Sequence, residues 1–277
     1  MTILTFTIIL LLGAYLAGLA GSLTGLGGGV VIIPLLTLVF HVDIRYAIGA
    51  ALVASIATSS GSASAYVKEG ITNIRLGMFL EIATTVGAVA GAILAVYTPV
   101  NIVAILFGVM LIFSAAMTLR KKPEGELETG SPLSYRLKLN SSYPTKDGIV
   151  SYKLKNIGGG FSIMTIAGVL SGLLGIGSGA LKVLAMDSAM RVPFRVSTTT
   201  SNFMVGVTAA ASAVVYLQRG YIDPGIAFPV IIGVLAGAFT GSKILMKINV
   251  KWLKLIFSVA ITAIAINMIY NGFHHKF

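Results

Sequence analysis

Two glycine clusters interrupt long apolar stretches and are the first features that suggest binding chemistry. They read Gly-Leu-Gly-Gly-Gly at 25–29 and Gly-Ile-Gly-Ser-Gly at 175–179. The apolar runs that follow, at 30–40 and 180–190, are too short to cross a bilayer. A helix that begins within a membrane presents free backbone N–H groups and the positive end of its dipole, which can hold a small anion without a charged side chain.

Side chains next to the second cluster could complete such a site. Lys182 stands in apolar sequence three residues after the cluster, where an ammonium is costly unless it is paired. It could bind the anion, form a structural pair with Asp187, or reach toward the membrane interface. Hydroxyls in membrane helices usually bond their own backbone, whereas an amide has no such habit. The expected substrate-binding residues are Gly27, Gly28, Gly29, Gly177, Ser178, Gly179, Lys182, Thr199 and Asn202.

A second group of charged residues suits coupling or gating. Glu81 is the only acidic residue inside a first-half apolar segment, and it could carry a coupling proton or serve as a counterion to Arg75. Arg45 and Arg195 stand where loops lead into helices, where arginines either steer anions or anchor headgroups. The coupling or gating candidates are Glu81, Asp187, Arg45 and Arg195.

The composition identifies the class of protein that must position these residues. Hydrophobic residues make up 56% of the chain, only 10% are charged, and the mean hydropathy is +0.93. We therefore expect an all-α integral membrane protein. The opening apolar run lacks the basic residues of a signal peptide, so it should be the first mature membrane segment. Cysteine is absent, which excludes disulfides and thiolate metal sites. The net charge of +11 is spread over loops without interleaved aromatic residues, which argues against a nucleic-acid partner.

The chain also carries an internal repeat. A shift of 150 residues places one glycine cluster on the other and Arg45 on Arg195. We expect two membrane repeats of about four to five segments each, at 1–119 and 157–277, each opening on a glycine-broken or re-entrant helix. Between them, residues 120–156 form a charged loop that should lie in the cytoplasm, with a β-hairpin pairing 135–139 and 149–154.

The repeats are expected to be inverted. If each repeat crosses the membrane an odd number of times, the basic residues fall on the cytoplasmic side and both termini lie outside. If the apolar segments before and after each glycine cluster instead form a single crossing, the basic cluster at 247–254 faces outward.

Several sequence patterns do not support the function that they usually indicate. Residues 175–180 fit the relaxed dinucleotide fingerprint, but neither a parallel sheet nor a suitably placed acid accompanies them. The three histidines, His41, His274 and His275, form no catalytic or metal-binding set, so no cofactor, metal or enzymatic activity is expected. The Gly-x-x-x-Gly pairs at 87–91 and 237–241 favour helix packing over ligand binding.

The chain resembles the TauE/SafE sulfite exporter family. The resemblance rests on 21–29 with Val30–Pro34, on the counterpart at 171–179, and on 195–202 (Arg-Val-Ser-Thr-Thr-Thr-Ser-Asn). It implies export of sulfite, an organosulfonate or another sulfur oxyanion across a bacterial or archaeal inner membrane, driven by an ion gradient. Two departures make the half-sites unequal: Leu184 stands where the first half has Pro34, and Lys182 stands where it has Ile32.

The competing function is an anion channel or passive pore. A channel requires a continuous polar lining or rings of charge, whereas the polar residues here concentrate at the two glycine clusters. The sequence therefore favours a secondary transporter whose partners are a small anion, the lipid bilayer and protons or sodium as the coupling ion. It leaves a homodimer open.

Overall fold

A computed structural model describes residues 3–24, 27–119, 130–145, 148–245 and 250–274. Six of its helices are long and apolar enough to cross a membrane, and three shorter apolar helical stretches accompany them. The first half contains α1 (Ile3–Thr24), α2 (Gly29–Pro34), the π-helical turn η1 (Leu35–Val39), α3 (Ile44–Lys68), α4 (Ile74–Tyr97) and α5 (Val100–Leu119).

The second half repeats this order with matching boundaries. It contains α7 (Ile157–Leu174), α8 (Gly179–Leu184), the π-helical turn η2 (Ala185–Ala189), α9 (Phe194–Gln218), α10 (Pro224–Leu245) and α11 (Val250–Phe273). The bounds of α2, η1 and α3 recur 150 residues later in α8, η2 and α9. Both short helices turn π-helical at the same point, although only the first contains a proline, so the change from Pro34 to Leu184 leaves the local backbone path unaltered.

Helices from the two halves pack against each other in matching pairs. α1 packs along α10 as α7 packs along α4, while α3 packs on α9 and α5 on α11. A Cβ added to Gly172 of α7 would overlap the backbone of Ala88 in α4, and one added to Gly237 of α10 would overlap the backbone of Tyr15 in α1. Gly87 and Gly91 likewise lie against the α7 backbone, which confirms their assignment to helix packing.

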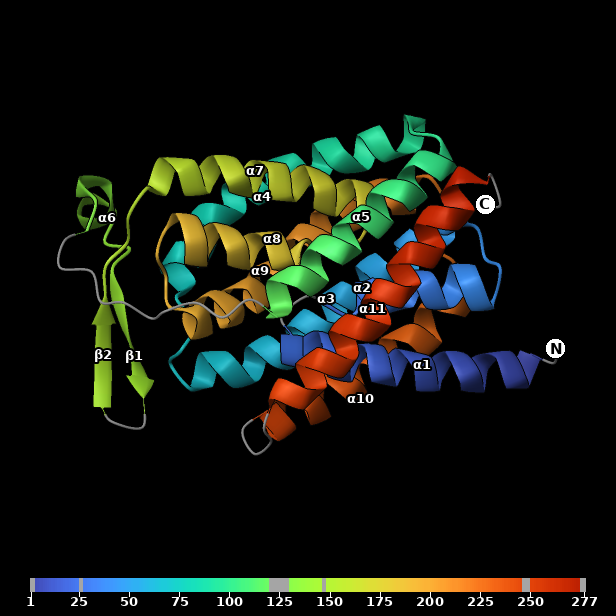
Figure 1. The fold of residues 1–277 in the computed structure, drawn as a ribbon, viewed down its shortest axis with the longest axis horizontal. Coiled ribbons are helices and arrows are strands. Elements are labelled where there is room, and N and C mark those ends of the chain that lie inside the picture. Colours follow the sequence, from blue (N-terminus) through green and yellow to red (C-terminus); the bar gives the residue numbers. More distant parts are fainter. Residues whose placement is uncertain (1–2, 25–26, 120–129, 146–147, 246–249, 275–277) are drawn as a thin grey trace.

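The two ends of the molecule differ (Figure 1). Both termini lie at one end, where α1 begins, and the β-hairpin lies at the other, where α7 begins. Large apolar side chains on α4, such as Ile82 and Val86, are exposed, as a lipid-facing surface requires.

The loop between the halves forms a short helix, α6 (Pro132–Arg136), followed by a two-stranded antiparallel hairpin, β1 (Ser141–Thr145) and β2 (Gly148–Tyr152). The second strand overlaps the predicted one. The prediction of a first strand at 135–139 is wrong, because Ser131 caps a helical turn there and the pairing begins at Ser141. Residues 120–129 of this loop lie outside the described residues.

The hairpin is fastened to the start of α4 through Asn73. Its side-chain oxygen caps α4 by accepting from the Leu76 amide, and its side-chain nitrogen donates to the Leu139 carbonyl and the Tyr152 hydroxyl. Tyr143, Tyr152 and Leu76 are buried in one apolar cluster, so the hairpin is part of the packed structure.

Candidate functional site

The two glycine breaks meet inside the molecule. A Cβ added to Gly29 would lie 3.0 Å from the carbonyl oxygen of Gly175, and one added to Gly27 would lie 3.7 Å from that of Ile176. Gly27, Gly175 and Gly177 have positive φ, a conformation that glycine adopts without steric cost. The breaks therefore require glycine both for backbone shape and for close approach; Gly25 lies outside the described residues.

The first break packs against α3. The amide of Gly28 donates to the hydroxyl of Thr58 over 3.2 Å. Ser55, one turn earlier in α3, is fully buried, and its hydroxyl oxygen would lie 2.9 Å from a Cβ on Gly29. That hydroxyl has no hydrogen-bond partner among the residues that the structure describes.

The second break packs against α9 and also contains unused polar groups. Ser178 adopts a left-handed φ of +47°, is 2% exposed, and has no hydrogen-bond partner for its hydroxyl within the described part of the chain. Asn202 is 1% exposed, and its side-chain nitrogen also has no hydrogen-bond partner within the described part of the chain. Ser201 fixes α9 to the break by donating to the carbonyl of Gly179 over 3.2 Å. Val205, one turn further along α9, lies against both Gly27 and Gly177.

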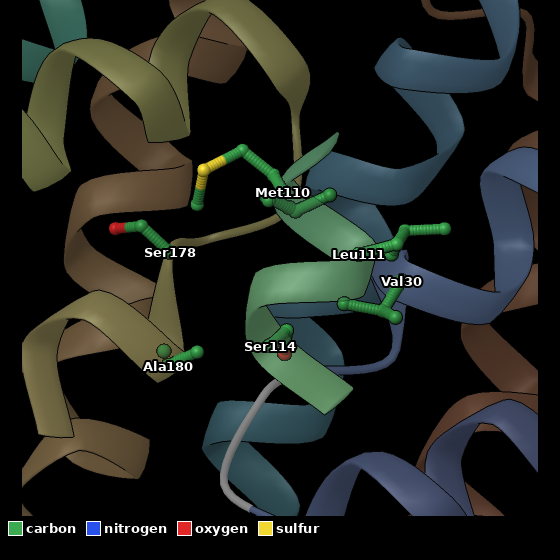
Figure 2. Close-up of a pocket in the computed structure, with 8 residues that line it drawn as sticks. Val30, Met110, Leu111, Ser114, Ser178 and Ala180 are labelled. Carbon is green, nitrogen blue, oxygen red and sulfur yellow. The ribbon is translucent and has the colours of Figure 1, made fainter. Parts of the chain in front are cut away.

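A small pocket lies between α5 and the starts of both short helices. Figure 2 shows Ser178 and Ala180 on one side of it and Leu111 and Val30 on the other. Val30 belongs to α2 and Ala180 to α8, so residues at both helix starts line the same space. The complete lining comprises Val30, Met110, Leu111, Ser114, Ile176, Ser178, Gly179 and Ala180.

Lys182 forms part of a separate buried cluster. It is fully buried, and its Nζ donates to the hydroxyl of Thr208 in α9. That hydroxyl donates to Oε1 of Glu81 in α4 over 2.5 Å, and Nζ lies 4.0 Å from Oε2 of the same carboxylate. Lys182 is not among the residues that line the pocket, but it stands one turn after Ser178, which does line it. Its ion pair is with Glu81, rather than with Asp187 as one sequence interpretation had it.

Glu81 is buried, at 5% exposure. Its Oε1 accepts from Thr208 and, over 3.3 Å, from Thr85, while Oε2 accepts no hydrogen bond from the described residues. Arg75, its alternative partner in the sequence interpretation, is exposed at the start of α4.

The structure does not bring the other predicted residues to the breaks. The Thr199 hydroxyl bonds its own helix at Arg195 and Val196, as hydroxyls in membrane helices commonly do. Arg45 and Arg195 each stand ten residues, about 15 Å along the helix, before the level of the breaks. Arg45 lies over the ring of Tyr221, with 5.9 Å from its Cζ to the ring centroid, and Arg195 is exposed. Asp187 is half-buried in η2.

Sequence reasoning missed Ser55, Ser114 and Thr208. A signal for Thr208 was present, because the shift of 150 residues places it on Thr58. Ser55 precedes Thr58 by about one helical turn and so shares its face. No sequence pattern identifies Ser114, because its position in the pocket depends on how α5 packs against the second break.

Comparisons with known proteins agree over nearly the whole chain. The family model described as "Sulfite exporter TauE/SafE" matches residues 10–268. The Bacillus subtilis protein named "Probable membrane transporter protein YunE" is 29% identical over 279 residues, which cover 97% of this chain and 99% of the relative. YdhB from the same bacterium is 27% identical over 85% of this chain and 89% of its own length. "Probable membrane transporter protein MJ0441" of Methanocaldococcus jannaschii is 23% identical over 90% of each chain. No solved structure matches.

Proposed function

The chain belongs to the TauE/SafE sulfite exporter family, and we propose that it exports sulfite or an organosulfonate by alternating access. Membership makes it a multi-pass membrane protein of a transporter family and not an enzyme. The meeting of the two glycine breaks carries the proposal. A secondary transporter holds its substrate where its two repeats meet, between the ends of interrupted helices.

We place the anion between the starts of α2 and α8. The first amides of a helix have no partner within it, so two helix starts that face one space offer several N–H donors to the oxygens of one anion. The shared pocket supports this placement, because Val30 from α2 and Gly179 and Ala180 from α8 line it together. Gly27, Gly28, Gly29 and Gly177 allow an anion to approach the backbone closely.

Polar side chains around the breaks complete the proposed site. Buried polar groups in native proteins nearly always have a partner, so unused ones call for an explanation. The hydroxyls of Ser178 and Ser55 and the amide of Asn202 are buried without a partner in the described structure. Ser178 lines the pocket, so its hydroxyl is the proposed side-chain donor there, and Ser55 and Asn202 are further candidate donors beside the breaks. Thr199 bonds its own helix and is the weakest of the proposed ligands.

The repeats are proposed to be inverted, with the hairpin end in the cytoplasm. Support comes from α1 beginning at the end with the termini and α7 at the hairpin end (Figure 1). Lys68 ends α3 and Arg75 lies in the first turn of α4, which is fastened to the hairpin. Arg191 and Arg195 stand at the start of α9, next to the segment that leads from the hairpin into α7, so basic residues gather at this end as the positive-inside rule requires. Lys247, which belongs to the same argument, lies outside the described residues. In this arrangement 1–119 and 157–277 are the repeats and 120–156 the cytoplasmic loop.

Two measurements test the proposal. In the first, thermal unfolding of the purified protein is followed with sulfite, sulfate, taurine, sulfoacetate or phosphate. We expect one sulfur oxyanion to raise the unfolding temperature, because a ligand that binds only the folded state stabilises it. In the second, counterflow of that anion is measured in proteoliposomes. Saturable exchange supports a transporter, whereas anion conductance without counterflow would identify a channel.

Ser178→Gly is the sharpest site variant. It removes the unused hydroxyl, relieves the left-handed backbone and copies the first repeat, where Gly28 stands at this position. We expect anion affinity to fall about tenfold, the worth of one hydrogen bond to a charged group, without loss of stability. Ser62→Ala is the matched control, because Ser62 is equally buried but donates to its own helix at Thr58. Equal effects of the two variants, or no stabilisation by any of the anions, would contradict the assignment.

A further inference from the structure

The buried cluster of Lys182, Thr208 and Glu81 joins the two halves of the chain. Lys182 and Thr208 come from α8 and α9, and Glu81 comes from α4. Burying a lysine and a glutamate at membrane depth is costly, and replacing such a pair by apolar residues is often neutral or stabilising. Stability alone therefore gives no reason for the pair, which points to a role in transport.

The cluster occurs once, although its framework occurs twice. At the equivalent positions of the other half, Ile32 replaces Lys182, Ile231 replaces Glu81, and Thr58 matches Thr208. Thr58 accepts from the backbone amide of Gly28 instead of from an ammonium. The interface of α8 with α9 and α4 therefore contains two charged residues that the matching interface of α2 with α3 and α10 lacks. Among the described residues, each chain has one such buried ion pair.

The surroundings of Glu81 contain no competing charge. α4 packs mainly against α7 and α9. α7 has no ionisable side chain, and the ionisable residues of α9, Arg195 and Tyr216, stand about 20 Å and 12 Å along the helix from Thr208. On α4 itself, Arg75 is exposed about 9 Å before Glu81, and Tyr97 stands in the last turn. Lys182 is therefore the charge that faces Glu81.

We propose that Glu81 takes up one proton for each anion that binds, so that Lys182 exchanges the carboxylate for the anion as its counterion. This inference rests on the proposed function. When Glu81 is ionised, its carboxylate neutralises the ammonium. A proton from the solvent that bonds to Oε2, the oxygen without a hydrogen-bond donor, removes that negative charge. Lys182 then lacks a counterion, and an anion at the break can replace the carboxylate.

The position of Lys182 allows this exchange of partners. Its backbone amide donates to the carbonyl of Ser178, so it stands one turn after the residue that lines the pocket. Its four-carbon stem can carry the ammonium from Thr208 toward the start of α8. When the anion leaves, the proton leaves Oε2 and the ion pair forms again. The two states have the same net charge if the anion carries one negative charge.

The test measures anion affinity against pH with probes that do not themselves titrate. Sulfate and methanesulfonate serve, because sulfite takes up a proton near neutral pH. Between about pH 5 and pH 8, uptake of one proton on binding makes affinity fall about tenfold for each unit that the pH rises. Calorimetry in two buffers of different ionisation enthalpy counts the protons directly and should give about one per anion.

Glu81→Gln isolates the residue. It keeps the size and much of the hydrogen bonding of the protonated acid, so binding should become independent of pH and take up no proton. Glu69→Gln, which removes a carboxylate at the end of α3, is the control and should behave as the unmodified protein does. A pH dependence that survives Glu81→Gln overturns the inference.

If the Glu81 variant does not fold, measurements on the unmodified protein alone still test the proton coupling. Binding without proton uptake overturns the coupling and leaves the proposed function standing. No binding of sulfate, methanesulfonate or any anion from the first experiment, at any pH, overturns the proposed function and the coupling together.

Discussion

The ammonium of Lys182 lies 4.0 Å from the carboxylate of Glu81, although the two residues belong to different halves of the chain. Thr208 bridges them by accepting from one and donating to the other. All three side chains are buried. The contact between the halves therefore contains a buried polar link, and its side chains cannot form hydrogen bonds with water when the link breaks.

Loss of one partner of this pair should be far more costly than loss of both. Lys182→Met should lower the free energy of unfolding by about 3–5 kcal/mol, because the carboxylate of Glu81 remains buried without a counterion. The double variant Lys182→Met, Glu81→Met should recover most of that loss. Chemical unfolding in detergent, followed by circular dichroism, gives the four free energies of the cycle. Additive losses would mean that the two charges do not interact.

Packing between α4 and α7 should tolerate no side chain at Gly172. A Cβ there overlaps the carbonyl of Ala88, a backbone group that cannot rotate away. Gly172→Ala should therefore lower the free energy of unfolding by about 1–3 kcal/mol. Gly158→Ala on the same helix is the control: a Cβ at that position meets no atom within 4 Å, so the unfolding midpoint should stay constant or rise. Equal midpoints for both variants would contradict the close contact.

Asn73→Ala should release the hairpin from the membrane helices. The variant loses two donor contacts to the loop and the cap of α4, with an expected cost of about 2 kcal/mol. Hydrogen exchange at 141–152 should accelerate while exchange in α9 stays slow. Asn271→Ala, which removes an amide that bonds Asn267 in its own helix, should leave the hairpin unchanged. Unaltered exchange in the Asn73 variant would show that other contacts hold the loop.

Stability should fall at high pH through Tyr152. Burial raises the pKa of its phenol from 10.0 to about 12, although the hydrogen bond from Asn73 partly opposes the change. A raised pKa favours the neutral phenol in the folded state. The contribution of Tyr152 to the free energy of unfolding is therefore fully present below pH 10. It is lost between about pH 10 and pH 12, which lowers the free energy of unfolding by about 2–3 kcal/mol.

Comparison with Tyr152→Phe separates this effect from the titration of other groups. The phenylalanine variant should be somewhat less stable at neutral pH because it loses the hydrogen bond with Asn73. The difference in unfolding free energy between the two proteins should then shrink or reverse as the pH rises from 10 to 12. A constant difference over this range would exclude Tyr152 as the titrating group.

Composition and pattern determined the membrane class, the repeat and the two breaks, because these depend on properties local to the chain. Twenty or so apolar residues require a lipid-like environment wherever they stand, and glycine clusters interrupt a helix whatever surrounds it. The matching bounds of α3 and α9 follow from the shift of 150 residues that the sequence already contained. The first strand of the hairpin escaped prediction because Ser131 caps a helical turn that alternating polarity could not distinguish from a strand.

Tertiary structure alone decided which buried groups meet. Lys182 had an acidic residue close by in sequence, Asp187, yet its ion pair is with Glu81 on a helix of the other half. The physical reason is that helix packing, rather than sequence distance, sets which side chains share a buried volume. The same reason explains why Ser55, which nothing in the sequence distinguishes from many other hydroxyl residues, lies beside the first break with its hydroxyl unused in the described structure, and why Ser114 of α5 lines the pocket.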